Sequence, residues 1–140
     1  MIVAIRISGD VEIPKEVREA LFRSRLRRKY SAVLFKPTKQ NIKILKFLRN
    51  YIAYGEINEE TLKLLIEKRA SMKNKKEKTH SDEIINQIEK REHISWSIKP
   101  FFRLHPPIGG IDSKNHFGTS KKSVLGDNKE KINDLLRRML

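Results

Sequence analysis

Strand-like and helix-like apolar patterns alternate within residues 1–57, and this alternation limits the possible folds more than any other feature of the chain. Val3, Ile5 and Ile7 lie two residues apart, as in a strand with one buried face. Further apolar runs predict strands at residues 32–35 and 51–57. Short strands separated by single helices favour a small sheet that is covered by helices.

The segments between these strands have helical spacing. Pro14 suits the first turn of a helix, and Thr38 can cap a second helix. The order β-α-β-α-β therefore predicts an α+β, ferredoxin-like arrangement for residues 1–57, with both helices on one face of the sheet.

Residues 58–140 predict a mainly helical extension. Helices are expected from Asn58 and from Ser81, and a short strand is expected at 101–105. Residues 106–128 have no apolar period and predict a long basic loop. The final helix is predicted from four apolar residues at helical spacing, Ile132, Leu135, Leu136 and Met139.

The positive charge is concentrated in one stretch. The net charge is +14, and residues 20–55 contain no Asp or Glu. A folded segment of one sign repels itself until an anion neutralises it, so a phosphate-binding surface is favoured over a merely solvated face. Arg6, on the first strand near Gly9, is a further candidate. The candidate residues in this part of the chain are Arg6, Arg23, Arg25, Arg27, Arg28, Lys29, Lys36, Lys39, Lys43, Lys46 and Arg49.

A second basic stretch covers residues 94–126 and contains one acidic residue, Asp112. Its loop, residues 106–126, is expected to become ordered on RNA and to be mobile in the free protein. Tyr54 could stack on a base or pack in the core, and the sequence does not favour either. The phenylalanines at 22, 35, 47, 101 and 102 are predicted to be core residues. The candidates added here are Tyr54, Arg103, His105, Lys114, Lys121 and Lys122.

Other chemistry is poorly supported. The chain has no cysteine, and its four histidines lack metal-ligand spacing, so neither a metal nor a cofactor is expected. No motif marks a catalytic nucleophile. No apolar run reaches the roughly 18 residues that cross a bilayer, and the first residues do not resemble a signal peptide. A cytoplasmic protein with no membrane contact and no small-molecule substrate is predicted.

Three segments resemble one family. Residues 54–69 include Tyr-Gly-Glu-Ile-Asn-Glu-Glu-Thr-Leu, and residues 99–107 read Lys-Pro-Phe-Phe-Arg-Leu-His-Pro-Pro. Residues 129–139 resemble the helix with which members of the same family end. In this order they resemble the archaeal form of large-subunit ribosomal protein thirty. The archaeal form is favoured over the eukaryotic form because no basic tail precedes the first strand. Tyr54 stands where the family usually has Trp.

The resemblance implies a structural constituent of the large ribosomal subunit that binds folded ribosomal RNA, in the region of 5S ribosomal RNA and beside other ribosomal proteins. It also implies that residues 1–57 form the RNA-binding core and that residues 58–140 are an archaeal-type extension. The alternatives are a small enzyme of acyl phosphatase type, for which Arg6 near Gly9 is the supporting feature, and an RNA-processing or DNA-binding factor.

Overall fold

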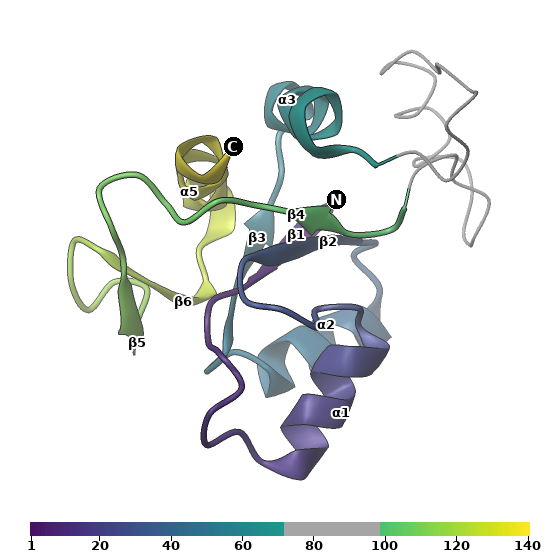
Figure 1. The fold of residues 1–140 in the computed structure, drawn as a ribbon, viewed down its shortest axis with the longest axis vertical. Coiled ribbons are helices and arrows are strands. Elements are labelled where there is room, and N and C mark those ends of the chain that lie inside the picture. The colour runs from purple at the N-terminus through teal and green to yellow at the C-terminus, as the bar shows by residue number, and fades with distance from the viewer. Residues whose placement is uncertain (72–98) are drawn as a thin grey trace.

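The computed structural model describes residues 1–71 and 99–140 (Figure 1). The helix predicted from Ser81 lies outside the described residues. The first part of the chain has the predicted alternation: β1 (Ile2–Arg6), α1 (Lys15–Arg23), β2 (Ser31–Phe35), α2 (Lys39–Phe47), β3 (Ile52–Glu56) and α3 (Glu59–Arg69). The second part contains β4 (Phe102–Arg103), β5 (Asp112–His116), β6 (Ser123–Asp127), a short 3₁₀ turn η1 (Lys129–Lys131) and α5 (Ile132–Met139).

Local chemistry explains several of the helix ends. Thr38 caps α2, because its hydroxyl accepts a hydrogen bond from the backbone N–H of Asn41 at 3.3 Å. Glu59 and Glu60 lie in the first turn of α3, and Lys68 and Arg69 lie in its last turn, so both ends suit the helix dipole. All four apolar residues that predicted the final helix are buried in α5.

The strands of the described residues form one six-stranded sheet in the order β4-β2-β1-β3-β6-β5. β1 lies inside the sheet and pairs antiparallel with both β2 and β3. The second part of the chain extends the sheet at both edges, because β4 adds to β2 and β6 adds to β3. The predicted extension is therefore part of the same sheet as the predicted core.

Each face of the sheet carries its own apolar cluster. One cluster joins Ala4 and Val33 to buried residues of α1 and α2, such as Leu21 and Leu45. The other joins alternate strand residues, among them Val3, to α3, β6 and α5. Figure 1 shows α1 and α2 on one side of the sheet and α3 and α5 on the other. The predicted placement of the first two helices on one face, and the α+β fold class, are confirmed.

Residues 106–128 differ from the prediction of a long loop. They contain β5 and β6, and Ser123, Val124, Leu125 and Gly126 of β6 are buried. The buried apolar run is only two residues long, which is too short to produce a period in the sequence. Asp112 also orders β5 locally, because its carboxylate accepts the backbone N–H groups of Lys114 and Asn115. These hydrogen bonds hold the pKa of Asp112 below its usual range.

Two aromatic predictions are also wrong. Phe22 on α1 and Phe47 on α2 are 50% and 53% exposed, whereas Phe102 is fully buried. Both exposed rings belong to helices whose opposite side faces the sheet. Phe22 instead lies beneath the guanidinium of Arg27, with 4.8 Å between the guanidinium carbon and the ring centre.

Candidate nucleic-acid interface

Residues 20–55, which contain no Asp or Glu, include two segments that lie at the same end of the sheet. Ile5 pairs with Ala32 near the start of β2, and Arg6 pairs with Ile52 at the start of β3. The segments that lead into β2 and β3 therefore lie near one another. These segments are the connection after α1, residues 24–30, and the end of α2 with Arg49. We call residues 24–30 the arginine loop.

The arginine loop begins with a tight helix end. The N–H of Leu26 donates to the carbonyl of Leu21 at 2.9 Å, and the N–H of Arg25 donates to the carbonyl of Phe22 at 3.0 Å. This pair of hydrogen bonds is the Schellman arrangement, in which glycine is the usual residue at the position of Arg25. Arg25 has φ 61°, which is left-handed backbone that costs a residue with a Cβ on the order of 1 kcal/mol. Arg25 therefore places a charged side chain at a position where glycine would relieve the backbone strain.

The loop also ends in left-handed backbone. Tyr30 has φ 62°. Its N–H donates to the carbonyl of Arg6 at 2.8 Å, and its carbonyl accepts the N–H of Leu104 at 2.9 Å. Tyr30 therefore connects β1 to the segment after β4. The arginine loop has a strained residue near each end, and both of these residues are held by hydrogen bonds.

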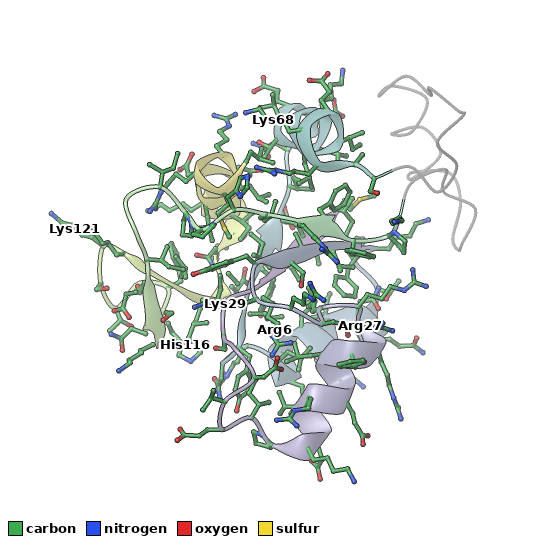
Figure 2. The ribbon with its side chains drawn as sticks, viewed as in Figure 1. Arg6, Arg27, Lys29, Lys68, His116 and Lys121 are labelled. Carbon is green, nitrogen blue, oxygen red and sulfur yellow. The ribbon has the colours of Figure 1, made fainter. Side chains whose placement is uncertain are left out.

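The arginine loop forms one wall of a hollow of about 570 Å³, which we call the basic hollow. The other wall comes from the segment around β4, because Ser31 pairs with Arg103. The residues that line it are Arg25, Arg27, Arg28, Lys29, Tyr30, Ser31, Pro100, Phe101, Arg103 and Leu104. Figure 2 shows Arg27 beyond the end of α1, on a different side of the molecule from Lys68 of α3.

The described residues that line the basic hollow have one sign of charge. They provide five cationic side chains and two aromatic ones, and none of them is Asp or Glu. Guanidinium groups match phosphate oxygens in geometry, and aromatic rings offer surfaces on which bases stack. The Lys29 ammonium already lies 5.0 Å from the ring centre of Tyr30. The hollow can therefore accept a polyanion that also carries flat rings.

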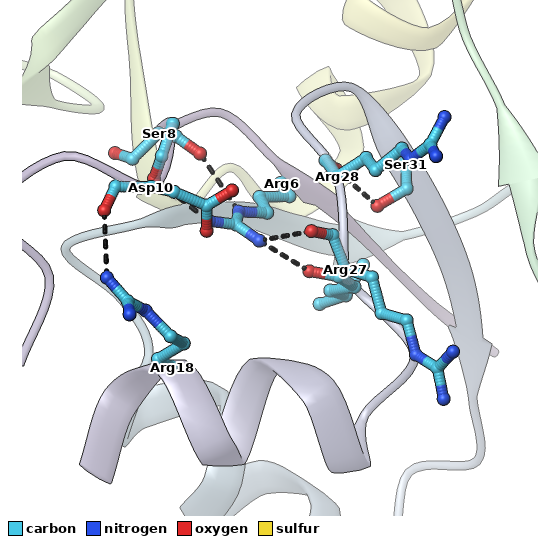
Figure 3. Close-up of polar contacts among 9 residues, drawn as sticks. Arg6, Ser8, Asp10, Arg18, Arg27, Arg28 and Ser31 are labelled. Atoms are coloured by element: carbon cyan, nitrogen blue, oxygen red, sulfur yellow. Dashed lines mark hydrogen bonds and ion pairs between the residues drawn. The ribbon is translucent and has the colours of Figure 1, made fainter. Parts of the chain in front are cut away.

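The structure corrects the prediction for Arg6. Its side chain is buried, with 1% exposed, and lies behind the arginine loop (Figure 3). All five of its N–H donors are used within the protein. Nε donates to the carbonyl of Ser8, Nη1 to the carbonyls of Leu26 and Arg27, and Nη2 to the carbonyl of Gly9 and to Asp10. No donor is left for a phosphate, so Arg6 does not contribute to the exposed basic surface.

Asp10 completes this network from the exposed side. Its carboxylate lies 2.7 Å from Nη2 of Arg6. The hydrogen bond and the charge of Arg6 together hold the pKa of Asp10 below its usual range. The backbone carbonyl of Asp10 also accepts from Arg18 of α1 at 3.2 Å. Residues 8–10 and the arginine loop are therefore fastened to the same guanidinium.

The remaining candidates of the first stretch do not line the basic hollow. Arg23 is exposed in the last turn of α1, Lys36 is half-buried after β2, and the cations of α2 and its C-terminal end are exposed: Lys39, Lys43, Lys46 and Arg49. Tyr54 is half-buried against the cluster of α1 and α2. Its burial, together with Asp127, raises the pKa of Tyr54. Tyr54 therefore packs in the free protein.

The sheet divides the second basic stretch between its two edges. Arg103 lies on β4, and Lys114 lies on β5 at the opposite edge. Lys121 and Lys122 precede β6 and accompany Lys114 there, and Figure 2 shows Lys121 far from Arg27. His105 is exposed, and its backbone N–H donates to the carbonyl of Met139. Of these five candidate residues, Arg103 alone lines the basic hollow with the arginine loop.

Sequence reasoning missed two aromatic residues of the hollow. Five of the eight residues before Tyr30 are cationic, and Phe101 lies two residues before Arg103. An aromatic residue close to basic residues in the sequence could therefore have indicated that both rings line the hollow. Within residues 1–71 and 99–140, no group of three His, Asp or Glu side chains could hold a metal ion. No helix in the described residues is long and apolar enough to cross a membrane.

These features define an α+β protein with a basic hollow at one end of its sheet and a stretch, residues 20–55, that contains no Asp or Glu. No family model matches the chain. It is 32% identical to large ribosomal subunit protein uL30 of Archaeoglobus fulgidus, over 99% of both chains. It is 31% identical to the uL30 proteins of Saccharolobus islandicus and Saccharolobus solfataricus, over 97% of this chain and 96% of each relative. The chain belongs to the uL30 family of large ribosomal subunit proteins, as predicted, and this family is one of structural proteins and not of enzymes.

Proposed function

We propose that this protein is a structural constituent of the large ribosomal subunit in the cytoplasm and that it binds folded ribosomal RNA through the basic hollow and the exposed cations of α1 and α2. The observation that carries the proposal is the meeting of Arg25, Arg27, Arg28, Lys29 and Arg103 around one hollow, which no acidic side chain of residues 1–71 or 99–140 lines. Close like charges repel each other, and RNA phosphates would convert this repulsion into attraction.

The hollow suits RNA that is not a plain duplex. Tyr30 and Phe101 lie among the cations, and unpaired bases stack on such rings. Phosphate contacts would fix the position of the protein, and the shape of the RNA would select the site. The RNA contacts of Lys114, Lys121 and Lys122 would form a separate surface, because these residues lie at the other edge of the sheet.

We further propose that residues 1–57 provide most of the RNA contacts and that residues 58–140 cover the second face of the sheet and supply Arg103. The helices α3 and α5 carry both acidic and basic residues, which suits contact with water or with neighbouring ribosomal proteins. A position in the region of 5S ribosomal RNA is part of the proposal and rests on the family resemblance.

The alternative of an acyl phosphatase-type enzyme is not favoured. Its supporting feature was an anion-binding Arg6 near Gly9. Arg6 uses all five donors on protein acceptors, and Gly9 itself supplies one of those acceptors. A DNA-binding role would use the same cations, and competition between duplex DNA and ribosomal RNA distinguishes it.

Charge reversal in the arginine loop tests the proposed function. Arg25, Arg27 and Arg28 are exposed and are replaced together by Glu. We expect the triple variant to fold and to be absent from large subunits, because six units of charge change where phosphates would bind. Sedimentation of tagged protein with large subunits from cell lysates measures incorporation, and circular dichroism of the purified protein measures folding.

A matched control carries the same change on the other helical layer. Lys68, Lys129 and Arg137 are exposed and are replaced together by Glu. Arg137 has an exposed ion pair with Glu60 at 3.4 Å, which contributes little to stability. We expect the control to incorporate nearly as well as the unmodified protein. Normal incorporation of the loop variant, or equal loss in both variants, would contradict the proposal.

A further inference from the structure

Arg6 occupies an unusual position for a basic residue in a protein of this charge. It is the largest of the fully buried side chains in the described residues. A buried guanidinium is costly unless every donor is paired, and here every donor is paired. Four of its five acceptors are backbone carbonyls of two loops. The guanidinium therefore holds the backbone of these loops in place more than it holds other side chains.

Two of these carbonyls belong to the arginine loop. Nη1 lies 3.0 Å from the carbonyl oxygen of Leu26 and 2.7 Å from that of Arg27. Leu26 is the first residue after the strained Arg25, and its apolar side chain is fully buried. Figure 3 shows the guanidinium of Arg6 between residues 8–10 and the loop, while the side chain of Arg27 points away from it.

The backbone of Arg6 fastens the other end of the same loop. Its carbonyl accepts the N–H of Tyr30, the second strained residue, at 2.8 Å. One residue of β1 therefore holds both halves of the arginine loop. Left-handed backbone at residues other than glycine persists only where surrounding contacts enforce it. Arg6 supplies three of these contacts: two from its side chain and one from its backbone.

We propose that Arg6 is a positioning residue that fixes the arginine loop in its RNA-binding conformation before RNA arrives, without touching RNA itself. The inference rests on the proposed function. Without the buried guanidinium, the loop would sample other conformations, and the repulsion among its cations would favour those that spread the charges apart. The apparent affinity for RNA would then equal the intrinsic affinity multiplied by the fraction of molecules whose loop is in the binding conformation, so it would decrease.

The test compares Arg6→Lys with Arg27→Met in the full chain, using a transcript of large-subunit ribosomal RNA as the probe. Lysine keeps the charge but has three donors on one atom, so it cannot reach both loops at once. Affinity is measured at several salt concentrations. We expect Arg6→Lys to lower affinity by about tenfold at every salt concentration, with an unchanged slope of log affinity against log salt.

The direct contact should behave differently. Arg27→Met removes one cation from the basic hollow, so the slope should decrease in magnitude by about one phosphate contact. Leu136→Ala is the structural control, because Leu136 is fully buried in the cluster on the opposite face of the sheet. It should lower stability and leave affinity unchanged. An affinity for Arg6→Lys equal to that of the unmodified protein, or a slope changed as in Arg27→Met, would overturn the inference.

A second measurement needs no variant and decides the question if Arg6→Lys does not fold. Amide hydrogen exchange is followed at Leu26 and Tyr30, the residues whose N–H groups hold the two ends of the loop. We expect slow exchange at both amides in the free protein and little further slowing on RNA. Fast exchange that becomes slow only with RNA would mean that RNA orders the loop, and the inference would be wrong.

The two proposals can fail separately. If Arg27→Met and the unmodified protein bind RNA equally at all salt concentrations, the proposed function of the basic hollow fails. If Arg27→Met weakens binding and Arg6→Lys does not, the hollow remains an RNA site and only the positioning role of Arg6 is lost.

Discussion

At the scale of single residues, Arg25 combines a poor backbone position with a useful side chain. It occupies the helix-ending position that favours glycine, with φ 61°, and its side chain lines the basic hollow. Arg6 is the converse case, since its side chain is buried and its charge is satisfied within the protein. Arginine is thus an exposed cation at position 25, whereas at position 6 it is a buried group that hydrogen-bonds to the backbone of two loops.

Arg25→Gly should separate stability from binding. Glycine has no Cβ to oppose left-handed backbone, so the free energy of unfolding should rise on the order of 1 kcal/mol. RNA affinity should fall, because one cation leaves the basic hollow. Urea unfolding and RNA binding on the same preparation measure the two effects.

Arg27→Gly is the matched control for this prediction. Arg27 is not among the residues with left-handed backbone, so glycine there brings no relief of strain. We expect lower affinity together with stability that is unchanged or lower, because glycine loses more conformational freedom on folding. A loss of stability in Arg25→Gly would show that the side chain of Arg25 supports the fold by contacts that outweigh the backbone strain.

At the scale of elements, β5 and β6 replace the predicted loop. β6 has a buried Val124 and Leu125 and lies between β3 and β5. β5 forms the edge of the sheet and is mostly exposed and polar. Asn128, the residue after β6, donates from its side chain to the carbonyls of Val124 and Gly126. Its backbone N–H donates to Tyr54, which fastens the end of β6 to β3.

Hydrogen exchange in the free protein should distinguish these two strands. Buried amides of β6 should exchange slowly, and so should Asp112 and Phe117, which donate to the carbonyls of Lys122 and Leu125 at 2.8 Å each. Amides on the open side of β5 should exchange quickly. Amides of β1, inside the sheet, provide the slow reference. Fast exchange throughout residues 112–127 would favour the original prediction of a loop that RNA orders.

At the scale of the whole molecule, the two predicted parts of the chain share one core. Among the described residues, the larger apolar cluster contains eighteen buried residues, of which seven come from residues 1–57 and eleven from residues 58–71 and 99–140. Gly55 on β3 lies so close to the second part that a Cβ there would be 2.2 Å from the carbonyl oxygen of Lys129. The division at residue 57, which we proposed for the RNA contacts, therefore crosses a packed interface.

A chain that ends at residue 57 should not fold cooperatively. It would expose Val3, Ile5, Ala32 and Leu34, which face α3 and α5 in the full chain, and a sheet of three short strands with two helices would be only marginally stable. Thermal unfolding followed by circular dichroism, with the full chain as control, measures this. A sharp unfolding transition in the fragment would make residues 1–57 an independent domain.

Local patterns were sufficient to determine the order of elements up to residue 69 and the final helix. Val3, Ile5 and Ile7 alternate, Thr38 caps α2, and Leu135 and Leu136 have helical spacing, and each of these signals arises within a few residues. The concentration of positive charge was equally visible, because composition does not depend on the fold. The sequence also carried the family resemblance, which the relatives confirm.

The tertiary structure alone decided which charges meet. Arg103 lies beside Arg27 because β4 pairs with β2, while Lys114 lies at the far edge because β5 follows β6 in the sheet. Arg6 and Arg27 cannot be told apart as isolated basic residues, yet one is buried and the other lines the basic hollow. Contacts between residues far apart in the chain determine burial, strand pairing and the partners of hydrogen-bond donors. Local sequence patterns do not contain this information.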